Sequence, residues 1–332
     1  MDILPDPSSS IFTTSNLTSL SLHHLYDEPQ YTRSQLSQIL RRHSNLQELV
    51  LDGSVLPSVE GPGALVPIAL PRLINLRLYG MVTAIAGFMK LIAMSPLHNV
   101  TLHLKSIRFM TTLALLDVLE QILTAYYECQ GLEYPRKVDD LTVSMRSVMV
   151  INASSSPAAP CHPTYNFRIQ TVEAINTLAA EIVLLFPLEH THTFAATELD
   201  LVEHRWRVVL QNMKGLSHLQ LDSLDIGPVM GALGLDDRGA RSGLLKSHQI
   251  PHKPTVEPYP PTAPKLQSLS LSNLDILLRL NEQLFNVLYQ RFNNYIGLKS
   301  LVIRACRVPT AEYGGDLESL VEEITLEGVV DI

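Results

Sequence analysis

The chain has 332 residues, of which 46% are hydrophobic and 17% charged, with a formal net charge of −8. This composition is typical of a folded aliphatic protein with ample material for a buried core, and it excludes an intrinsically disordered chain. The acidic balance argues against nucleic acid or an anionic membrane surface as the main partner.

The start of the chain and its apolar stretches indicate an intracellular protein, cytoplasmic or nuclear. Residues 1–14, MDILPDPSSSIFTT, are predicted to be a flexible segment, because they lack the basic and apolar regions of a signal peptide. The longest apolar stretch, at 174–188, is too short to cross a bilayer. The three cysteines lie far apart without a C-x-x-C pair, which suits a reducing compartment and excludes a disulfide framework or a zinc site.

From residue 17 onwards one spacing of aliphatic residues recurs, beginning with Leu17, Leu20 and Leu22 in NLTSLSLHHL. This L-x-x-L-x-L ladder fits neither the period of a helix nor that of a strand. Its first positions fall at 17, 46, 73, 97, 138, 196, 216, 266, 298 and 321. Five of the nine intervals lie in the window of roughly 20–29 residues that is typical of leucine-rich repeats.

Amphipathic segments fill most of the intervals between ladders, with apolar residues at i, i+3 and i+4. A ladder strand that alternates with a helix predicts parallel strand pairing and an α/β fold. The predicted helices span 32–43, 83–94, 112–127, 171–186, 204–213 and 276–292.

Two insertions are predicted within an otherwise continuous domain over 15–332. The first, at about 144–170, has two alternating stretches around a Ser/Pro/Ala-rich loop at 152–163, which predicts a hairpin-like excursion of one strand. The second, at 236–264, contains six prolines and no periodicity, which predicts a disordered segment.

These irregular ladders, in stretches such as LTSLSLHHLYDE and NLQELVLDG, resemble the repeat region of fungal F-box/leucine-rich-repeat proteins. The resemblance covers residues 15–330 and implies a curved solenoid, a horseshoe with parallel strands on its concave face and helices on its convex face. Proteins of that family are adaptors: the F-box docks on a Skp-type subunit of a cullin–RING ubiquitin ligase, and the repeats hold the substrate.

The ladders begin at residue 17, which leaves no room upstream for an F-box. A Skp-type partner is therefore expected only if the full-length protein carries that element, and a stand-alone binding scaffold is the alternative. Short repeats usually place Asn or Cys at the ninth position of the ladder. Only Cys306 matches here, which predicts irregular curvature.

Motifs for catalysis, cofactors or metals are weak. Glu189, His190 and His192 in LEHTHT could place two imidazoles on one side of a strand, but no third fixed ligand accompanies them, so a polar loop is the preferred interpretation. No nucleophile elbow, phosphate-binding loop or dinucleotide motif is present, so neither an enzyme nor a cofactor is predicted. An enzymatic site in the insertions is the least favoured alternative. Trp206 is interpreted as half-buried on a helix, with a partner anchor as its alternative.

The third, fifth and seventh residues of each ladder point away from the core and are expected to line the concave surface. Eight of them are acidic and two are basic, which predicts a protein partner with a basic segment; a merely solvated face is the alternative. The candidate partner-binding residues are Glu48, Asp52, Arg77, Tyr79, His103, Asp140, Glu198, Asp200, His218, Asp222 and Arg304.

Overall fold

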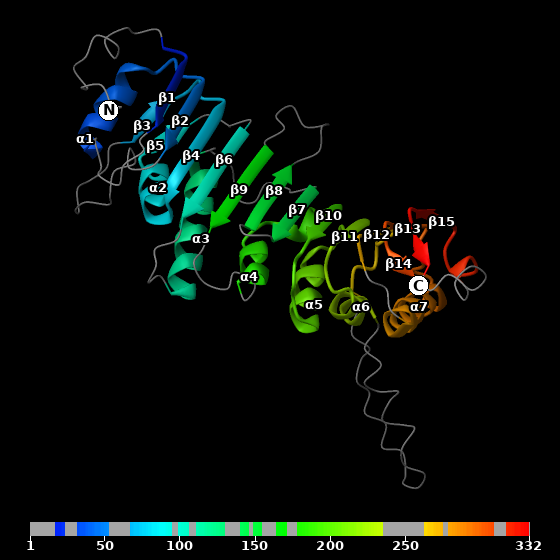
Figure 1. Cartoon of the computed structure of the whole chain (residues 1–332). Helices are drawn as coiled ribbons and strands as arrows, with labels where there is room; N and C mark the ends of the chain where they lie inside the picture. The colour runs from blue at the N-terminus through cyan, green and yellow to red at the C-terminus, as the bar shows by residue number, and fades with distance from the viewer. Residues whose placement is uncertain are drawn as a thin grey trace, which may run out of the picture. The chain divides into compact units, whose positions relative to one another are not determined.

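Parallel strands alternate with helices in a computed structural model of the chain, so the predicted α/β class is confirmed (Figure 1). The chain divides into two units, Met1–Leu188 and Glu189–Ile332. A single continuous solenoid over 15–332 stays a prediction. Within the described part of the chain, no helix combines the length and apolarity needed to cross a membrane. The structure describes residues 17–23, 32–52, 67–94, 99–105, 111–129, 140–145, 149–154, 164–170, 178–234, 262–274, 278–308 and 317–331.

The sheet of the first unit has the strand order β1-β2-β4-β6-β9-β8-β7. Pairing is parallel from β1 to β9 and antiparallel from β9 to β7. Figure 1 shows helices α1, α2 and α3 on the same side of this sheet. The strands are β1 (Ser19–His23), β2 (Glu48–Asp52), β4 (Asn75–Met81), β6 (Asn99–Lys105), β7 (Asp140–Met145), β8 (Met149–Ser154) and β9 (Thr164–Gln170). The helices are α1 (Arg33–Arg42), α2 (Val82–Met89), α3 (Thr112–Cys129) and α4 (Ala179–Leu184).

Helix α1 shows why the predicted helices form. Thr32 and Gln35 make a capping box, in which each side chain bonds the backbone N–H of the other residue and satisfies donors that the first turn leaves open. Leu36, Ile39 and Leu40, the residues of the predicted apolar stripe, are all fully buried. The helix predicted over 32–43 is therefore confirmed, with each end one residue shorter than predicted.

The helix predicted over 83–94 is too long. Helix α2 ends at Met89, and Ile92–Met94 forms a short strand, β5, that pairs in parallel with β3 (Ile68–Leu70). The Leu91 N–H donates to the Phe88 carbonyl and turns the chain out of the helix. Buried apolar residues continue into β5, so the periodicity alone does not reveal where the helix stops.

The stretch at 144–170, where a hairpin-like excursion was predicted, contains the strands β8 and β9, which pair antiparallel with each other. Strand β9, not the ladder at 138, pairs with β6, so the ladder strand β7 lies two strands further along the sheet. Only three residues join β7 to β8, and a parallel return needs a far longer crossover. Residues 152–154 of the predicted loop belong to β8, while 155–163 lie outside the described residues.

The second unit pairs its five main strands in parallel and in sequence order. Helices α5, α6 and α7 lie on the same side of this sheet (Figure 1). Helix α6 was not predicted, because its seven residues include two glycines. The main strands are β10 (Thr193–Thr197), β11 (His218–Asp222), β12 (Ser268–Ser272), β13 (Ser300–Arg304) and β15 (Glu323–Glu327). The other elements are α5 (Glu203–Asn212), α6 (Gly227–Leu233), α7 (Leu278–Asn293) and the short parallel pair β14 (Arg307–Val308) and β16 (Val330–Asp331), with a 3₁₀ turn at Leu188–His190.

The ladder residues occupy equivalent places in both units. Nine of the ten predicted ladders lie on strands in the predicted register; the exception is the ladder that starts at Ala196. On β1, β2, β4 and β6, and on β11, β12 and β13, ladder residues of neighbouring strands lie directly opposite one another and are buried, so each of these strands extends two aliphatic rows. One such row is Leu20, Leu49, Leu76 and Val100, and another is Leu219, Leu269 and Leu301.

Two turns recur with the strands. Before a strand, the N–H of the first ladder residue donates to the carbonyl three residues earlier, as from Leu46 to His43 and from Leu216 to Met213. After every main strand of the second unit, one residue has a positive φ, and the first four of these donate their N–H to the last residue of the neighbouring strand. These left-handed residues are Glu198, Ser223, Asn273, Ala305 and Gly328.

Two buried side chains correct the sequence analysis. Trp206 is fully buried on α5, with its ring centroid 6.1 Å from that of Phe194, so it is neither half-exposed nor a partner anchor. Arg291 is buried on α7 and donates to the carbonyls of Thr262 and Ala263, at 3.1 and 2.9 Å. Thr262 and Ala263 are themselves buried, so this end of the predicted 236–264 insertion belongs to the packed unit. Residues 235–261 lie outside the described residues.

Candidate interaction surface

Alternate side chains of the ladder strands point away from the buried rows and form a polar face on each sheet. We name these the first and second strand faces. The first contains Ser19, Ser21, His23, Glu48, Val50, Asp52, Asn75, Arg77, Tyr79, Thr101 and His103. The second contains Thr193, Ala195, Thr197, His218, Gln220, Asp222, Ser268, Ser270, Ser272, Ser300, Val302, Arg304, Glu323, Thr325 and Glu327.

Acidic side chains of the first strand face have partners on a neighbouring strand. His23 Nδ1 lies 3.4 Å from Asp52 Oδ2, directly across the β1–β2 pair. Arg77 Nη2 lies 3.9 Å from Glu48 Oε1, and the Ser19 hydroxyl donates to Glu48 Oε2 at 3.2 Å. Solvent-exposed pairs of this kind contribute only about 0–1 kcal/mol each, but they offset the like-charge repulsion that an acidic strip would carry.

An aromatic pair adjoins these charges. Tyr79 and His103 lie opposite each other on β4 and β6, with ring centroids 5.8 Å apart in an edge-to-face arrangement. Both side chains are partly exposed. Tyrosine and arginine are enriched among the residues that dominate binding energy at protein interfaces, so Arg77, Tyr79 and His103 together form the most interface-like patch of the first face.

The second strand face is rich in small hydroxyl side chains. Ser268, Ser270 and Ser272 fill the exposed positions of β12, and charged residues lie on the strands to either side. Asp222 accepts hydrogen bonds from Asn273 Nδ2 at 2.7 Å and from the Ser223 hydroxyl at 3.1 Å. Arg304 Nε lies 2.8 Å from Glu327 Oε2, directly across the β13–β15 pair.

The predicted positions of Glu198 and Asp200 on a strand were wrong. Strand β10 ends at Thr197, and its buried residues Phe194 and Ala196 lie opposite Leu219 and Leu221. Glu198 is the left-handed residue that follows the strand, with φ 53°, and Asp200 lies in the loop before α5.

Two of the eight acidic residues predicted for the strand faces, Glu198 and Asp200, therefore do not belong to them. Leu199 and Leu201 imitate a ladder because both are buried in the loop, although neither is on a strand. Glu198 and Asp200 therefore do not lie on a strand beside Asp222, where their ladder positions would place them. Asp140 begins β7, but its side chain lies outside the described set.

The LEHTHT segment packs as a polar loop. Glu189 Oε1 accepts a hydrogen bond from Lys214 Nζ at 2.9 Å, and this bond with the charge of Lys214 lowers the pKa of Glu189. His192 Nδ1 lies 3.1 Å from the Gly215 carbonyl oxygen, a distance at which the protonated nitrogen donates. Among the described residues, no three His, Cys, Asp or Glu side chains are grouped so as to hold a metal ion.

Cys306 has the structural role expected of a ninth ladder residue. Its thiol is fully buried and donates to the Arg304 carbonyl at 3.2 Å, with the Leu271 carbonyl at 3.6 Å. Burial raises the pKa of this thiol, which is the opposite of what a nucleophilic cysteine requires. Cys306 therefore stabilises the turn after β13.

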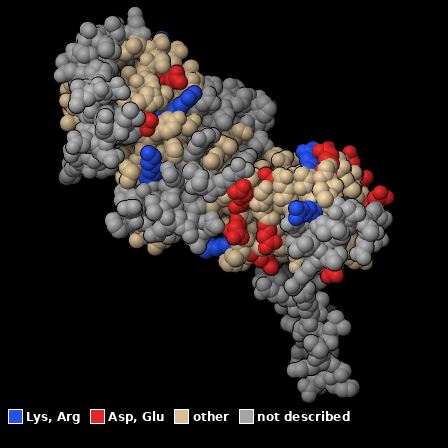
Figure 2. Space-filling model, in the orientation of Figure 1, with Lys and Arg blue, Asp and Glu red and all other residues tan. Residues whose placement is uncertain are grey.

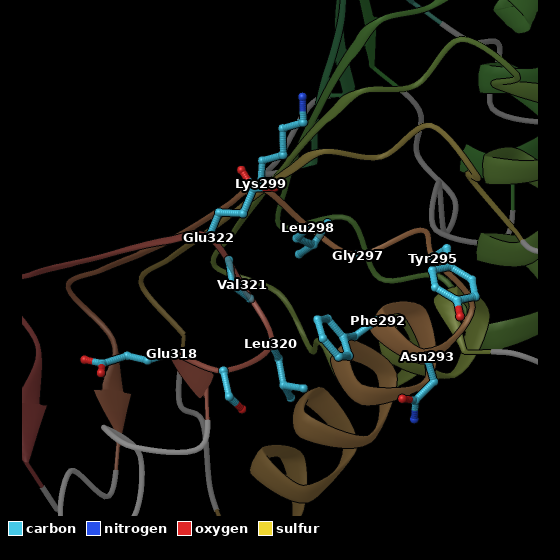
Figure 3. A pocket seen from close by; sticks show the side chains of 11 residues that line it. Phe292, Asn293, Tyr295, Gly297, Leu298, Lys299, Glu318, Leu320, Val321 and Glu322 are labelled. Carbon is cyan, nitrogen blue, oxygen red and sulfur yellow. The ribbon is translucent and has the colours of Figure 1, made fainter.

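An open pocket of about 720 Å³ lies between the end of α7 and the segment before β15. Figure 3 shows Phe292, Leu298 and Leu320 around its centre, with Tyr295 at the far side and the carboxylate of Glu318 pointing away. Tyr295 follows the end of α7 with φ 60°, the left-handed conformation that glycine usually adopts after a helix, and it is 98% exposed. The sequence analysis did not predict this pocket, which depends on the packing of two distant segments.

No model of a known protein family matches the chain, and no curated protein matches it. A function must therefore be inferred from the surfaces themselves.

Proposed function

We propose that the chain is an irregular leucine-rich-repeat solenoid that binds a protein partner through its strand faces. The main support for this proposal is the repeated strand register. Aliphatic rows are buried on one side of each sheet, and polar rows lie on the other side. Stacked repeats of this kind create extended surfaces whose composition varies from strand to strand, as protein recognition requires.

The make-up of the faces favours a protein over a small molecule. Small-molecule sites are concave and mostly apolar, with a few convergent polar groups. The first strand face instead has polar contacts between neighbouring strands, His23 with Asp52 and Arg77 with Glu48, beside the aromatic pair of Tyr79 and His103. Because its carboxylates are already paired, the partner should match a mixed patch centred on Arg77 and Tyr79 rather than supply only basic groups.

Two forms of this function differ in what the partner does. The resemblance to F-box/leucine-rich-repeat proteins supports an intracellular substrate receptor of a ubiquitin ligase, with a Skp-type partner only if an F-box is present. A stand-alone scaffold is the alternative. Affinity purification from native cells separates them, because only the first form should bring down Skp-type and cullin subunits.

The binding face is tested with two matched variants of the tagged protein. Tyr79→Ala removes the partly exposed aromatic ring of the first strand face, whereas Tyr289→Ala removes a half-exposed ring from α7. The first variant should lose the co-purifying proteins that the wild type retains, and the second should keep them. Circular dichroism confirms that both are folded. Equal capture by both variants would contradict the proposal.

A further inference from the structure

The last main strand of the second unit leaves its aliphatic row uncovered. Ile303 on β13 is 1% exposed, but Leu326, directly opposite it on β15, is 59% exposed. Ile324, opposite the fully buried Leu301, is also partly exposed. A row that is buried on every preceding strand of this sheet thus reaches solvent at β15.

The backbone of β15 is open along the same edge. The Glu323 N–H donates to Lys299, and the Glu327 carbonyl accepts from Ala305, so these residues face β13. Because N–H and C=O groups alternate in direction along a strand, those of Ile324 and Leu326 point to the other side. In the described part of the chain, β13 is the only strand that pairs with β15. Unpaired edges of this kind are templates for another strand.

Acidic side chains flank the uncovered row. Glu322, Glu323 and Glu327 are all exposed, and Figure 2 shows acidic side chains gathered at the β13–β15 end of the unit. Arg304 pairs with Glu327, but Glu323 has no ion-pair partner among the described residues. The edge therefore combines open hydrogen-bonding groups, two aliphatic side chains and net negative charge.

The charges argue against a second copy of the chain at this edge. A two-fold antiparallel pairing of β15 centred on Thr325 would place Glu323 opposite Glu327 of the other copy. Like charges directly opposite each other destabilise a strand pair, whereas opposite charges stabilise it. The better occupant is a strand whose basic residues oppose the two glutamates.

We propose that the edge of β15 binds an extended segment of a partner protein with the pattern basic–aliphatic–polar–aliphatic–basic. Backbone bonds to Ile324 and Leu326 extend the sheet, aliphatic side chains continue the uncovered row, and basic side chains oppose Glu323 and Glu327. The spacing of the glutamates is symmetric about Thr325, so the same pattern fits in either strand direction. This site shares Glu323 and Glu327 with the second strand face but lies at the open edge of its last strand, and it includes no residue of the first strand face.

The probe is a blocked, fluorescently labelled peptide, Lys-Val-Thr-Val-Lys, titrated with the full chain at low ionic strength. We expect saturable binding that weakens as salt screens the charges. A control peptide with glutamates in place of the lysines should not bind. Methylation of the backbone nitrogens that face β15 should abolish binding of the basic peptide, because it removes hydrogen-bond donors to the strand without changing the charge of the peptide.

Two matched charge reversals locate the site. Glu323→Lys should weaken binding of the basic peptide by about fivefold or more, since it turns an attractive cross-strand pair into a repulsive one. Glu282→Lys makes the same change at an exposed position of α7 and should leave binding unchanged. Tyr79→Ala should also leave it unchanged, which separates this result from failure of the strand-face proposal.

Three results would overturn the inference. The first is no binding of the basic peptide to wild-type protein up to millimolar concentration. The second is equal binding by the wild type and Glu323→Lys. The third is sedimentation of the wild type as a dimer that excludes the peptide, which would assign the edge to a second copy.

Discussion

The two units use the same ladder but connect their strands differently. In the second unit every main strand is parallel, and a left-handed residue follows each one. The first unit also starts with parallel strands, β1, β2, β4, β6 and β9, and then continues into β8 and β7, which pair antiparallel. The difference shows that the ladder determines which side chains are buried, whereas the length of the connection determines the direction of the strand.

The largest expected effect concerns the aromatic core of the second unit. Trp206→Ala should lower the free energy of unfolding by about 3–5 kcal/mol through lost burial and a residual cavity. Trp206→Phe should lower the free energy of unfolding much less. The buried indole N–H has no acceptor among the described residues, so phenylalanine removes an unsatisfied donor while it keeps an aromatic ring. Urea denaturation of both variants tests this. A loss below about 1 kcal/mol for the alanine variant would mean that β10 and α5 are not packed together.

Next in size are the aliphatic rows, which both units share. Leu219→Ala, Leu269→Ala and, in the first unit, Leu76→Ala should each cost roughly 2–5 kcal/mol. Gln220→Ala and Ser270→Ala, on the opposite side of the same strands, should change stability by less than about 0.5 kcal/mol. Chemical denaturation compares the two sets. Similar losses in both would mean that the register is wrong by one residue.

A smaller effect distinguishes the turns of the second unit. Ala305→Gly should stabilise the second unit by about 0.5 kcal/mol, because glycine adopts a positive φ without the Cβ clash. The gain is small because glycine loses more chain entropy on folding. Gly328→Ala should destabilise by about 1 kcal/mol from backbone strain alone, since an added Cβ meets no atom closer than 3.9 Å. The melting temperature should rise for Ala305→Gly and fall for Gly328→Ala. Shifts of the same sign would contradict the left-handed turns after β13 and β15.

The smallest effect is electrostatic. The folded pKa of Glu189 is lowered, so its pairing with Lys214 contributes stability above the usual carboxyl pKa and loses it as pH falls through the folded pKa. Lys214→Met should return the pKa of Glu189 towards its ordinary value with little change in melting temperature, since both side chains are exposed. NMR titration of the carboxyl group measures this. An unchanged pKa would show that the pair does not persist in solution.

The sequence predicted the strands whose burial alternates strictly, such as SLSLS and HLQLD, because a period of two leaves little choice of register. It failed at β10, where Phe194 and Ala196 fill the ladder positions and two buried loop leucines imitate the motif. Strands β3 and β5 are only three residues long and carry no periodic signal. Burial is thus encoded locally, while strand order and helix ends depend on distant pairing.

The candidate surface was predictable only in part. Alternation places Arg77 and Tyr79 on the exposed side of β4, as expected from the ladder. The polar contact of His23 with Asp52 joins residues 29 positions apart, so it emerges only once the strands are aligned. The acidic strip is smaller than expected, because Glu198 and Asp200 lie off the strands and other carboxylates have partners on a neighbouring strand. The pocket beside Tyr295 and the open edge of β15 also depend on packing between distant segments.

The central claim, that polar rows face solvent while aliphatic rows are buried, is tested most directly by thiol accessibility. Single cysteines are placed at Ser268, Leu269, Ser270 and Leu271 in a background with Cys129 and Cys161 replaced by serine. The rate of reaction with a thiol reagent is then measured in native buffer, with the buried Cys306 as internal reference. The account predicts fast labelling at 268 and 270 and protection at 269 and 271. Uniform rates, or the inverse alternation, would contradict it.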